Sequence, residues 1–280
     1  MQIPRIVHQL WKTDGVPGRW RRAVESVKKY HKGWEYRLWT DALIDDYVRA
    51  KHPRFYPVFA GMNRHIMRID VFRYLLMHDV GGLYCDVDYE FVRPYDYGDA
   101  ELVLSLEYDV AYGDDVNQVA NYVFASVPGH ALWRDVLENL QQHPPHAPES
   151  TDVCLVTGPW YLSGIFFKNQ SRYSGVRLTP KPTLSPRRVH GRRERKFYVN
   201  SGITYGFHYG WGSWRDRLSL GYLKERIAKR LGVYKPRNSV QARCRARPRP
   251  PGRGPVRARR DFSRSHARSS PRRGEPVVCA

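Results

Sequence analysis

The sequence has no apolar run long enough to form a membrane-spanning helix. Such a helix needs about 20 consecutive, predominantly apolar residues, and no stretch of the 280-residue chain reaches that length. Residues 1–6 also lack the apolar core of a secretory signal. We therefore expect a cytoplasmic protein, with peripheral contact at the inner face of a membrane as a further option.

Cysteine is scarce as well, and its spacing gives no sign of a metal finger. The chain has four cysteines, namely Cys85, Cys154, Cys244 and Cys279. No two of them form a CxxC pair or show metal-finger spacing. We expect reduced thiols, as in a reducing compartment.

Acidic residues are rare toward the C-terminal end. Residues 236–280 contain thirteen arginines and only two acids, so this segment carries +11 of the formal net charge of +20. It is rich in proline, glycine and serine without apolar periodicity, and we expect it to be disordered. Its charge is suited to electrostatic binding of nucleic acid. Because it carries no recognisable nucleic-acid-binding motif, no specific nucleic acid is expected as a partner.

Residues 1–214 have the pattern of one α/β domain. Strand-like and helix-like segments alternate, which predicts a mostly parallel central sheet flanked by helices. Strands are expected over residues 3–11, 35–39, 83–91, 101–107, 119–126, 176–178, 197–199 and 203–207. Helices are expected over residues 20–30, 41–51, 59–79, 128–142 and 159–168.

A separate segment, residues 215–235, follows this domain. Residues 215–231 place leucine and isoleucine on one helical face and basic residues elsewhere, which predicts a basic amphipathic helix. We expect this helix either to pack on the domain or to lie on an anionic membrane.

The most informative pattern is Asp86-Val87-Asp88, within the expected strand 83–91. Alternate side chains of a strand share a face, which would set the two carboxylates about 6–7 Å apart. Carboxylates this close repel each other, and a hard divalent cation such as Mn²⁺ or Mg²⁺ relieves that repulsion while also binding phosphate oxygens. Because a D-x-D pair is common at exposed strand ends, this interpretation depends on the surrounding residues.

Those surroundings include Asp70 and Arg73, three residues apart on one face of the expected helix 59–79. The turn Gly81-Gly82 would bring that face toward the strand with the two aspartates. As a surface salt bridge, the pair would contribute at most about 0.5 kcal/mol. As part of a site, Asp70 would accept hydrogen bonds from sugar hydroxyls and Arg73 would contact phosphate or sugar oxygens.

In this combination, the chain resembles the sugar-binding region containing the DXD motif of glycosyltransferase family 32. That family includes bacterial capsule and polysaccharide glycosyltransferases and fungal mannosyltransferases. The segments that carry the resemblance are residues 3–13, 70–74 and 81–88, with weaker matches at Asn121, 125–130, 157–159, His208 and 212–214. The resemblance therefore covers the whole expected domain.

The resemblance implies a GT-A nucleotide-diphospho-sugar transferase fold. It implies metal ligation by Asp86, Asp88 and His208, and catalytic roles for Asp70, Arg73, Asp86 and Asp88. The implied donor-binding residues are Trp11, Asp70, Arg73, Tyr84, Asn121, Ser213 and Trp214. Ordinary packing is an alternative role for Trp11 and for His208.

The predicted function is a metal-dependent, retaining hexosyl transfer from a UDP- or GDP-sugar to a saccharide or lipid-linked acceptor, in capsule, polysaccharide or other glycan synthesis. Negative charge develops on the departing diphosphate, where a cation and Arg73 would stabilise it. Glu107, Asp114 and Asp115 lie in a loop that either meets the acceptor or is simply solvated. Two alternatives remain, a basic adaptor that binds nucleic acid or membrane and a metal-dependent phosphohydrolase.

Overall fold

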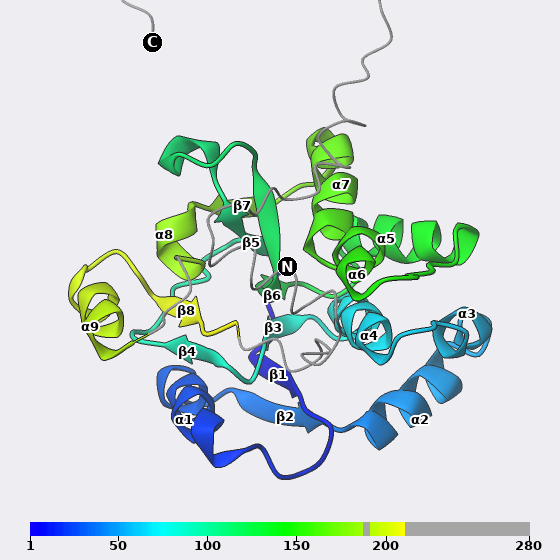
Figure 1. The fold of residues 1–280 in the computed structure, drawn as a ribbon, viewed down its shortest axis with the longest axis horizontal. Helices are drawn as coiled ribbons and strands as arrows, with labels where there is room; N and C mark the ends of the chain where they lie inside the picture. Colours follow the sequence, from blue (N-terminus) through cyan, green and yellow to red (C-terminus); the bar gives the residue numbers. More distant parts are fainter. Residues whose placement is uncertain (187–190, 211–280) are drawn as a thin grey trace, which may run out of the picture. The chain divides into compact units, whose positions relative to one another are not determined.

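A six-stranded sheet runs through the part of the chain that the computed structural model describes, residues 1–186 and 191–210 (Figure 1). In spatial order, its strands are β2 (Glu35–Trp39), β1 (Ile6–Leu10), β3 (Gly82–Cys85), β6 (Gln118–Ser126), β5 (Leu102–Tyr108) and β7 (Val176–Thr179). β1 pairs in parallel with β2 and β3, and β5 with β7, whereas β6 is antiparallel to both neighbours. The expected mostly parallel α/β sheet is confirmed.

Two further strands form a short antiparallel ribbon. These are β4 (Tyr89–Phe91) and β8 (Gly206–His208), which pair with Tyr89 opposite His208. The ribbon joins segments that lie more than a hundred residues apart in the sequence, and it brings the end of the described chain next to the DXD segment.

Helices cover both faces of the sheet (Figure 1). On one side lie α1 (Arg21–Tyr30), α8 (Lys181–Leu184) and α9 (Arg192–Asn200). On the other lie α2 (Asp41–Lys51), α3 (Tyr56–Ala60), α4 (His65–Asp79), α5 (Ala131–Gln142), α6 (Val153–Val156) and α7 (Pro159–Asn169). Because both faces are covered, the central strands β1, β3 and β6 are buried almost throughout.

Strand β3 shows this two-sided burial most clearly. Tyr84 packs into the larger hydrophobic cluster, where its ring lies 5.2 Å from that of Phe124. Leu83 and Cys85 point the opposite way, into a second cluster that includes Val27 of α1. The residue that follows them, Asp86, is therefore held at the boundary between two packed cores.

The connection from α4 to β3 requires glycine. Gly82 has φ +97°, and a Cβ at this position would lie 2.5 Å from the carbonyl oxygen of Ile6 on the neighbouring strand. Gly81 has φ +67°, and its Cβ would lie 2.6 Å from the carbonyl oxygen of Ser126. Without side chains at these two positions, β3 can enter the sheet directly after the helix.

The expected helix 59–79 is in fact two helices, α3 and α4, separated by a turn at residues 61–64. A single apolar stripe does not describe the burial of α4. Ile66 and Ile69 are only partly buried, whereas Met67 and Val71 are fully buried. α4 lies inside the protein with almost no polar face, so helical periodicity was a poor guide to its orientation.

Two other sequence predictions were wrong. The expected strand 83–91 is interrupted by a turn at Val87 and Asp88, so β3 and β4 belong to different sheets. Residues 197–199, expected as a strand because of their aromatic and β-branched side chains, lie in α9. There, packing of the Tyr198 ring against Phe207, with 6.3 Å between centroids, favours a helix over the local strand preference.

The expected amphipathic helix 215–231, the segment 236–280, Ser213 and Trp214 all lie outside the described residues. Among the described helices, none combines the length and the apolar character needed to cross a bilayer.

Candidate active site

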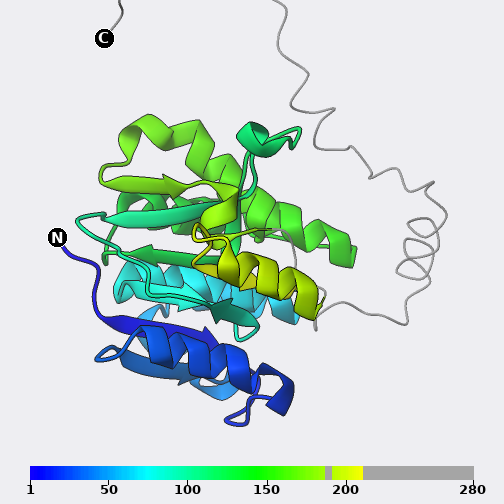
Figure 2. The ribbon, with the colours of Figure 1, turned by 90° about the vertical axis from the view of Figure 1, so that its left-hand side faces the viewer.

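The candidate site lies where parallel strands β1 and β3 end. His8 of β1 pairs with Tyr84 of β3, so the residues that follow both strands emerge at the same edge of the sheet. In Figure 2, β1 (dark blue) runs from left to right, and this edge faces the right of the view. Ligands of open α/β sheets bind at the carboxyl ends of the strands.

The DXD segment forms a tight turn at this edge. The Tyr89 amide donates to the carbonyl oxygen of Asp86 at 3.0 Å, and the Asp86 amide donates to that of Tyr122 at 3.0 Å. The side-chain amide of Gln9 also donates to the Asp86 carbonyl, at 3.1 Å. The expectation that the two aspartates share a strand face was therefore wrong, and backbone hydrogen bonds in a turn position them instead.

His208 lies against both aspartates. Its Nε2 is 2.9 Å from Oδ1 of Asp88 and 3.5 Å from Oδ2 of Asp86. The pairing of β4 with β8 sets its position, and its ring stacks on Tyr122 with 4.0 Å between centroids. Burial alone would lower the pKa of His208, but the neighbouring Asp88 and Asp86 raise it to about 10.

Together these three side chains form a cluster of potential metal ligands. One ligand atom from each of Asp86, Asp88 and His208 lies within 4.8 Å of the others. Carboxylate oxygens suit hard divalent cations, and a neutral imidazole nitrogen completes many transition-metal sites. A cation bound here would take the place of the proton that Asp88 and Asp86 favour on His208. The residues present therefore fit a divalent cation.

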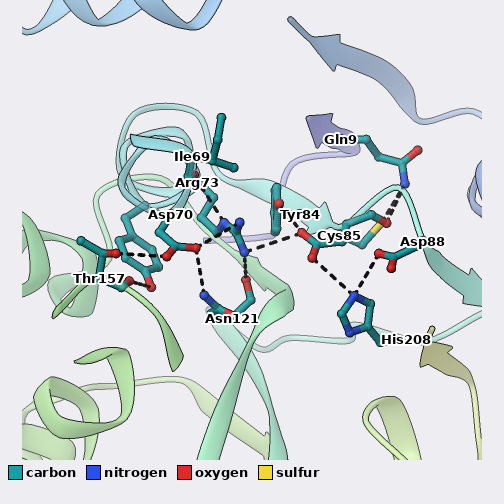
Figure 3. Close-up of polar contacts among 12 residues, drawn as sticks. Gln9, Ile69, Asp70, Arg73, Tyr84, Cys85, Asp88, Asn121, Thr157 and His208 are labelled. Carbon is teal, nitrogen blue, oxygen red and sulfur yellow. Dashed lines mark hydrogen bonds and ion pairs between the residues drawn. The ribbon is translucent and has the colours of Figure 1, made fainter. Parts of the chain in front are cut away.

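Asp70 and Arg73 form a second, more deeply buried group (Figure 3). Nη2 of Arg73 lies 3.2 Å from Oδ1 of Asp70, and each side chain is at most 5% exposed. The Asp70 carboxylate also accepts hydrogen bonds from Nδ2 of Asn121 and Oγ1 of Thr157, both at 3.1 Å. This pair is a buried, fully hydrogen-bonded ion pair rather than a surface salt bridge.

The charges of this pair are coupled. Burial raises the pKa of Asp70 to about 6, while Arg73, Thr157 and Asn121 oppose that rise. Burial alone would lower the pKa of Arg73, but the neighbouring acidic groups, Tyr84, Asp86 and Asp70 among them, raise it. At neutral pH, the carboxylate and the guanidinium are both charged.

Arg73 also connects the two groups. Its Nη1 lies 3.6 Å from Oδ1 of Asp86 and donates to the carbonyl oxygen of Asn121 at 2.5 Å. Its guanidinium lies over the Tyr84 ring, 4.9 Å from the centroid, and the Tyr84 hydroxyl donates to Asp86 at 2.5 Å. Figure 3 shows the resulting continuous chain of polar contacts, from Thr157 at one end to His208 and Asp88 at the other.

The structure thus brings together most of the residues implicated by the sequence, including Asn121. Tyr84 is only 1% exposed and reaches the site through its hydroxyl. Trp11 is half-buried at the end of β1, where its amide donates to the carbonyl oxygen of Trp39 at 3.0 Å. Trp11 therefore lies at the same edge of the sheet as the DXD turn. Of the three acids expected in a loop, Glu107 instead lies in β5, and Asp114 pairs with Lys181, with 2.5 Å between Nζ and Oδ2.

Three contributors were not assigned roles from the sequence. Thr157 binds Asp70, Gln9 holds the DXD turn, and Tyr122 stacks on His208. Gln9 follows His8 in β1, and both polar side chains are fully buried. Two adjacent polar residues within a short strand are an unusual combination that could have drawn attention to Gln9. Thr157 and Tyr122 carry no such local signal.

A buried acid supports the segment around His208. Glu90 of β4 is 2% exposed and accepts hydrogen bonds from Nε of Arg22 at 3.1 Å, from Nε of Arg195 at 3.1 Å and from the Tyr209 hydroxyl at 2.6 Å. It therefore ties α1, α9 and the residue after His208 together.

Comparison with known proteins identifies the family. The chain is 31% identical to inositol phosphoceramide mannosyltransferase 1 of Schizosaccharomyces pombe over 234 residues, which cover 79% of this chain and 68% of that protein. Residues 17–104 match the family model described as a glycosyltransferase sugar-binding region containing DXD motif. The chain belongs to this glycosyltransferase family.

The alignments with two other members of the family cover a smaller share of those proteins. Inositol phosphoceramide mannosyltransferase 2 of Schizosaccharomyces pombe is 30% identical, with 76% of this chain aligned to 59% of that protein. The mannosyl phosphorylinositol ceramide synthase CSH1 of Saccharomyces cerevisiae is 29% identical, with 62% aligned to 45%. Among solved structures, the PaToxG glycosyltransferase matches with a TM-score of 0.43 and 16% identity, covering 60% of this chain and 70% of that one.

Proposed function

We propose that this protein transfers a mannosyl or related hexosyl group from a nucleoside-diphosphate sugar to a glycolipid acceptor, in a reaction that depends on Mn²⁺ or Mg²⁺. Family membership supports the transfer reaction, and the names of the relatives supply the sugar and the acceptor class. Between the two acceptor classes expected from the sequence, a saccharide and a lipid-linked acceptor, these names favour the second.

The observation that carries the proposal is the proximity of two groups of side chains. Asp86, Asp88 and His208 fit a divalent cation, which when bound would neutralise charge on the diphosphate of the donor. Asp70 lies on the other side of Arg73 from this cluster. A donor that spans both groups would have its diphosphate at the first and its sugar near the second.

Each group has a defined task in this proposal. Asp70 is ionised at neutral pH. Its Oδ1 contacts both Asn121 and Arg73, whereas its Oδ2 accepts a hydrogen bond from Thr157 and has a further lone pair that can accept one from a sugar hydroxyl. Arg73 uses its donors on Asp70, Asp86 and the Asn121 carbonyl. It therefore keeps the two carboxylates at a fixed separation and adds positive charge close to the leaving group.

We infer that the transfer retains the anomeric configuration, as the resemblance implies. In a front-face reaction, the acceptor hydroxyl attacks the anomeric carbon while the bond to the diphosphate oxygen breaks on the same side. The hydroxyl proton passes to the departing phosphate oxygen, so this chain needs no dedicated side-chain nucleophile.

The test is a panel of GDP- and UDP-sugars, measured by calorimetry and by release of nucleoside diphosphate, with Mn²⁺ or Mg²⁺ and then with a chelator. At least one nucleotide sugar should bind and be slowly hydrolysed only with the metal. Asp88→Asn should abolish both effects, whereas Asp46→Asn, an exposed aspartate of α2, should leave them unchanged. Absence of binding across the panel would overturn the proposal, and release of phosphate from simple phosphoesters would identify a phosphohydrolase instead.

A further inference from the structure

Helix α9 presents a mixed apolar and basic face away from the protein. Arg193, Lys196, Phe197 and Asn200 follow one another at three- and four-residue spacing, so they share one helical face. Together with Ser201, they line a shallow hollow on the surface. Arg193 and Lys196 are exposed and contribute two positive charges to this face.

Two large apolar side chains are exposed on α9 and directly after it. Phe197 is 67% exposed, and Ile203, in the turn directly after the helix, is 59% exposed. Exposed large apolar side chains on and directly after one helix are candidates for a contact surface. We call Arg193, Lys196, Phe197 and Ile203 the α9 surface.

The opposite face of α9 is firmly attached to the candidate active site. Arg195 binds the buried Glu90, and the ring of Tyr198 packs against Phe207, which precedes His208 in β8. Figure 1 shows α9 (yellow) beside β8 and β4 at the margin of the fold. A partner that binds the α9 surface would therefore be held at a fixed position relative to His208.

The turn after α9 is also fixed. Arg93, which follows β4, donates from Nη2 to the carbonyl oxygen of Val199 at 2.8 Å and from Nη1 to that of Gly202. These bonds satisfy backbone acceptors at the C-terminal end of the helix. The backbone next to Ile203 is consequently held at the C-terminal end of α9.

We propose that the α9 surface binds the anionic surface of a lipid membrane. Phe197 and Ile203 would enter the headgroup region, while Arg193 and Lys196 pair with lipid phosphates. A short helix with an aromatic anchor and basic neighbours is typical of interfacial membrane contact. The positive charge favours anionic lipids over an uncharged protein surface as the occupant.

The role of this membrane contact rests on the proposed function, and it specifies where the proposed reaction would take place. A glycolipid acceptor stays in the membrane while its headgroup reacts, so the enzyme must work at the membrane surface. Attachment through α9, which packs directly on the strand carrying His208, would bring the site to the headgroups.

The test measures sedimentation of the full chain with two kinds of vesicle, pure phosphatidylcholine and phosphatidylcholine with 30% phosphatidylinositol, without donor or metal. The Phe197→Ser/Ile203→Ser variant should bind the anionic vesicles at least tenfold more weakly than wild type. Leu43→Ser, which removes a 49% exposed apolar side chain on α2, is the matched control and should bind as wild type does. Any contribution from basic residues 211–280 is the same in all these proteins.

A second variant tests the charges. Arg193→Ser/Lys196→Ser should weaken binding to the anionic vesicles and leave the weaker binding to phosphatidylcholine vesicles unchanged. If the Phe197/Ile203 variant binds anionic vesicles as tightly as the Leu43 control, or if wild type binds neither vesicle, the proposal is wrong. Because the assay contains no nucleotide sugar, its result is independent of whether the chain transfers sugar.

Discussion

Nη1 of Arg73 lies 3.6 Å from Oδ1 of Asp86, and this ion pair joins the buried helix α4 to the turn that carries the DXD motif. The same guanidinium binds Asp70 one turn earlier in its own helix. One cation therefore separates the proposed sugar-binding carboxylate from the proposed metal-binding carboxylates and offsets the repulsion between them.

We predict that Arg73→Met destabilises the protein by about 3–5 kcal/mol, because it leaves the Asp70 carboxylate buried without its counter-charge. Urea unfolding at pH 7 measures the effect. In the Asp70→Asn/Arg73→Met variant, part of the loss should be recovered, because the uncompensated charge is gone.

The matched control for this prediction is Arg49→Met. Arg49 forms an i,i+4 ion pair with Asp45 at the surface, 2.7 Å between Nη2 and Oδ2, and is 64% exposed. Its loss should change the free energy of unfolding by less than about 1 kcal/mol. Equal effects of the two substitutions would contradict the view that burial of the Arg73 pair determines its importance.

A second prediction concerns the hydroxyl of Tyr84, which donates to Asp86 at 2.5 Å. Groups that orient a metal ligand typically change metal affinity by about 10–100-fold when they are removed. Tyr84→Phe should therefore weaken Mn²⁺ binding by at least about tenfold, measured by calorimetry, while the protein remains folded.

Tyr173→Phe serves as the control for Tyr84→Phe, because the Tyr173 hydroxyl also donates to a carboxylate, Asp135, at 2.8 Å. It removes the same chemical group at a place away from the DXD turn. Unchanged Mn²⁺ affinity in Tyr84→Phe, or an equal loss in Tyr173→Phe, would show that the Tyr84 hydroxyl does not orient Asp86.

Local patterns in the sequence predicted the parts of the fold that local interactions determine. β2 and α2 begin and end where the sequence indicated. The start of α2 is a local feature, because the Thr40 side chain caps the helix by accepting a hydrogen bond from the Leu43 amide at 3.3 Å. The closeness of Asp70 and Arg73 to the DXD motif was also predictable, because only a few residues and the Gly81-Gly82 turn separate them in the sequence.

Contacts between distant segments could not be predicted in this way. The hydrogen bond between His208 and Asp88 depends on the pairing of β4 with β8, and it spans 120 residues. A family resemblance implied that contact, but no spacing did. The contribution of Thr157 to Asp70 likewise spans 87 residues. The alternation of side chains along a strand gave wrong positions for Asp86 and Asp88, because the chain forms a turn there. Hydrogen bonds from Gln9 and to the Tyr122 carbonyl hold the backbone of Asp86 in this turn.

A third prediction tests the glycine turn before β3. Gly82→Ala would place a Cβ 2.5 Å from the Ile6 carbonyl oxygen at φ +97°, so we expect a destabilisation of more than about 2 kcal/mol in urea unfolding. Gly15→Ala is the control, because a Cβ at Gly15 would meet nothing within 4 Å. A Gly82→Ala protein as stable as Gly15→Ala would mean that the backbone here relaxes easily.

The last prediction is a pH dependence of stability that originates at His8. Trp39 Nε1 donates to His8 Nδ1 at 3.1 Å, so the ring proton is on Nε2, which donates to the Gly81 carbonyl at 3.0 Å. A second proton on Nδ1 would face the indole N–H. Burial lowers the pKa of His8 from 6.5 to about 4.

Because the folded state disfavours the charged ring, His8 stabilises the protein fully above pH 6.5 and loses this contribution as the pH falls toward 4. The change corresponds to about 3 kcal/mol.

Urea unfolding of wild type and His8→Gln at a series of pH values should show their difference in stability shrinking by that order between pH 7 and pH 4. Leu43→Ala, which alters no titratable group, should differ from wild type by a constant amount. A constant difference for His8→Gln as well would mean that His8 is not the residue responsible.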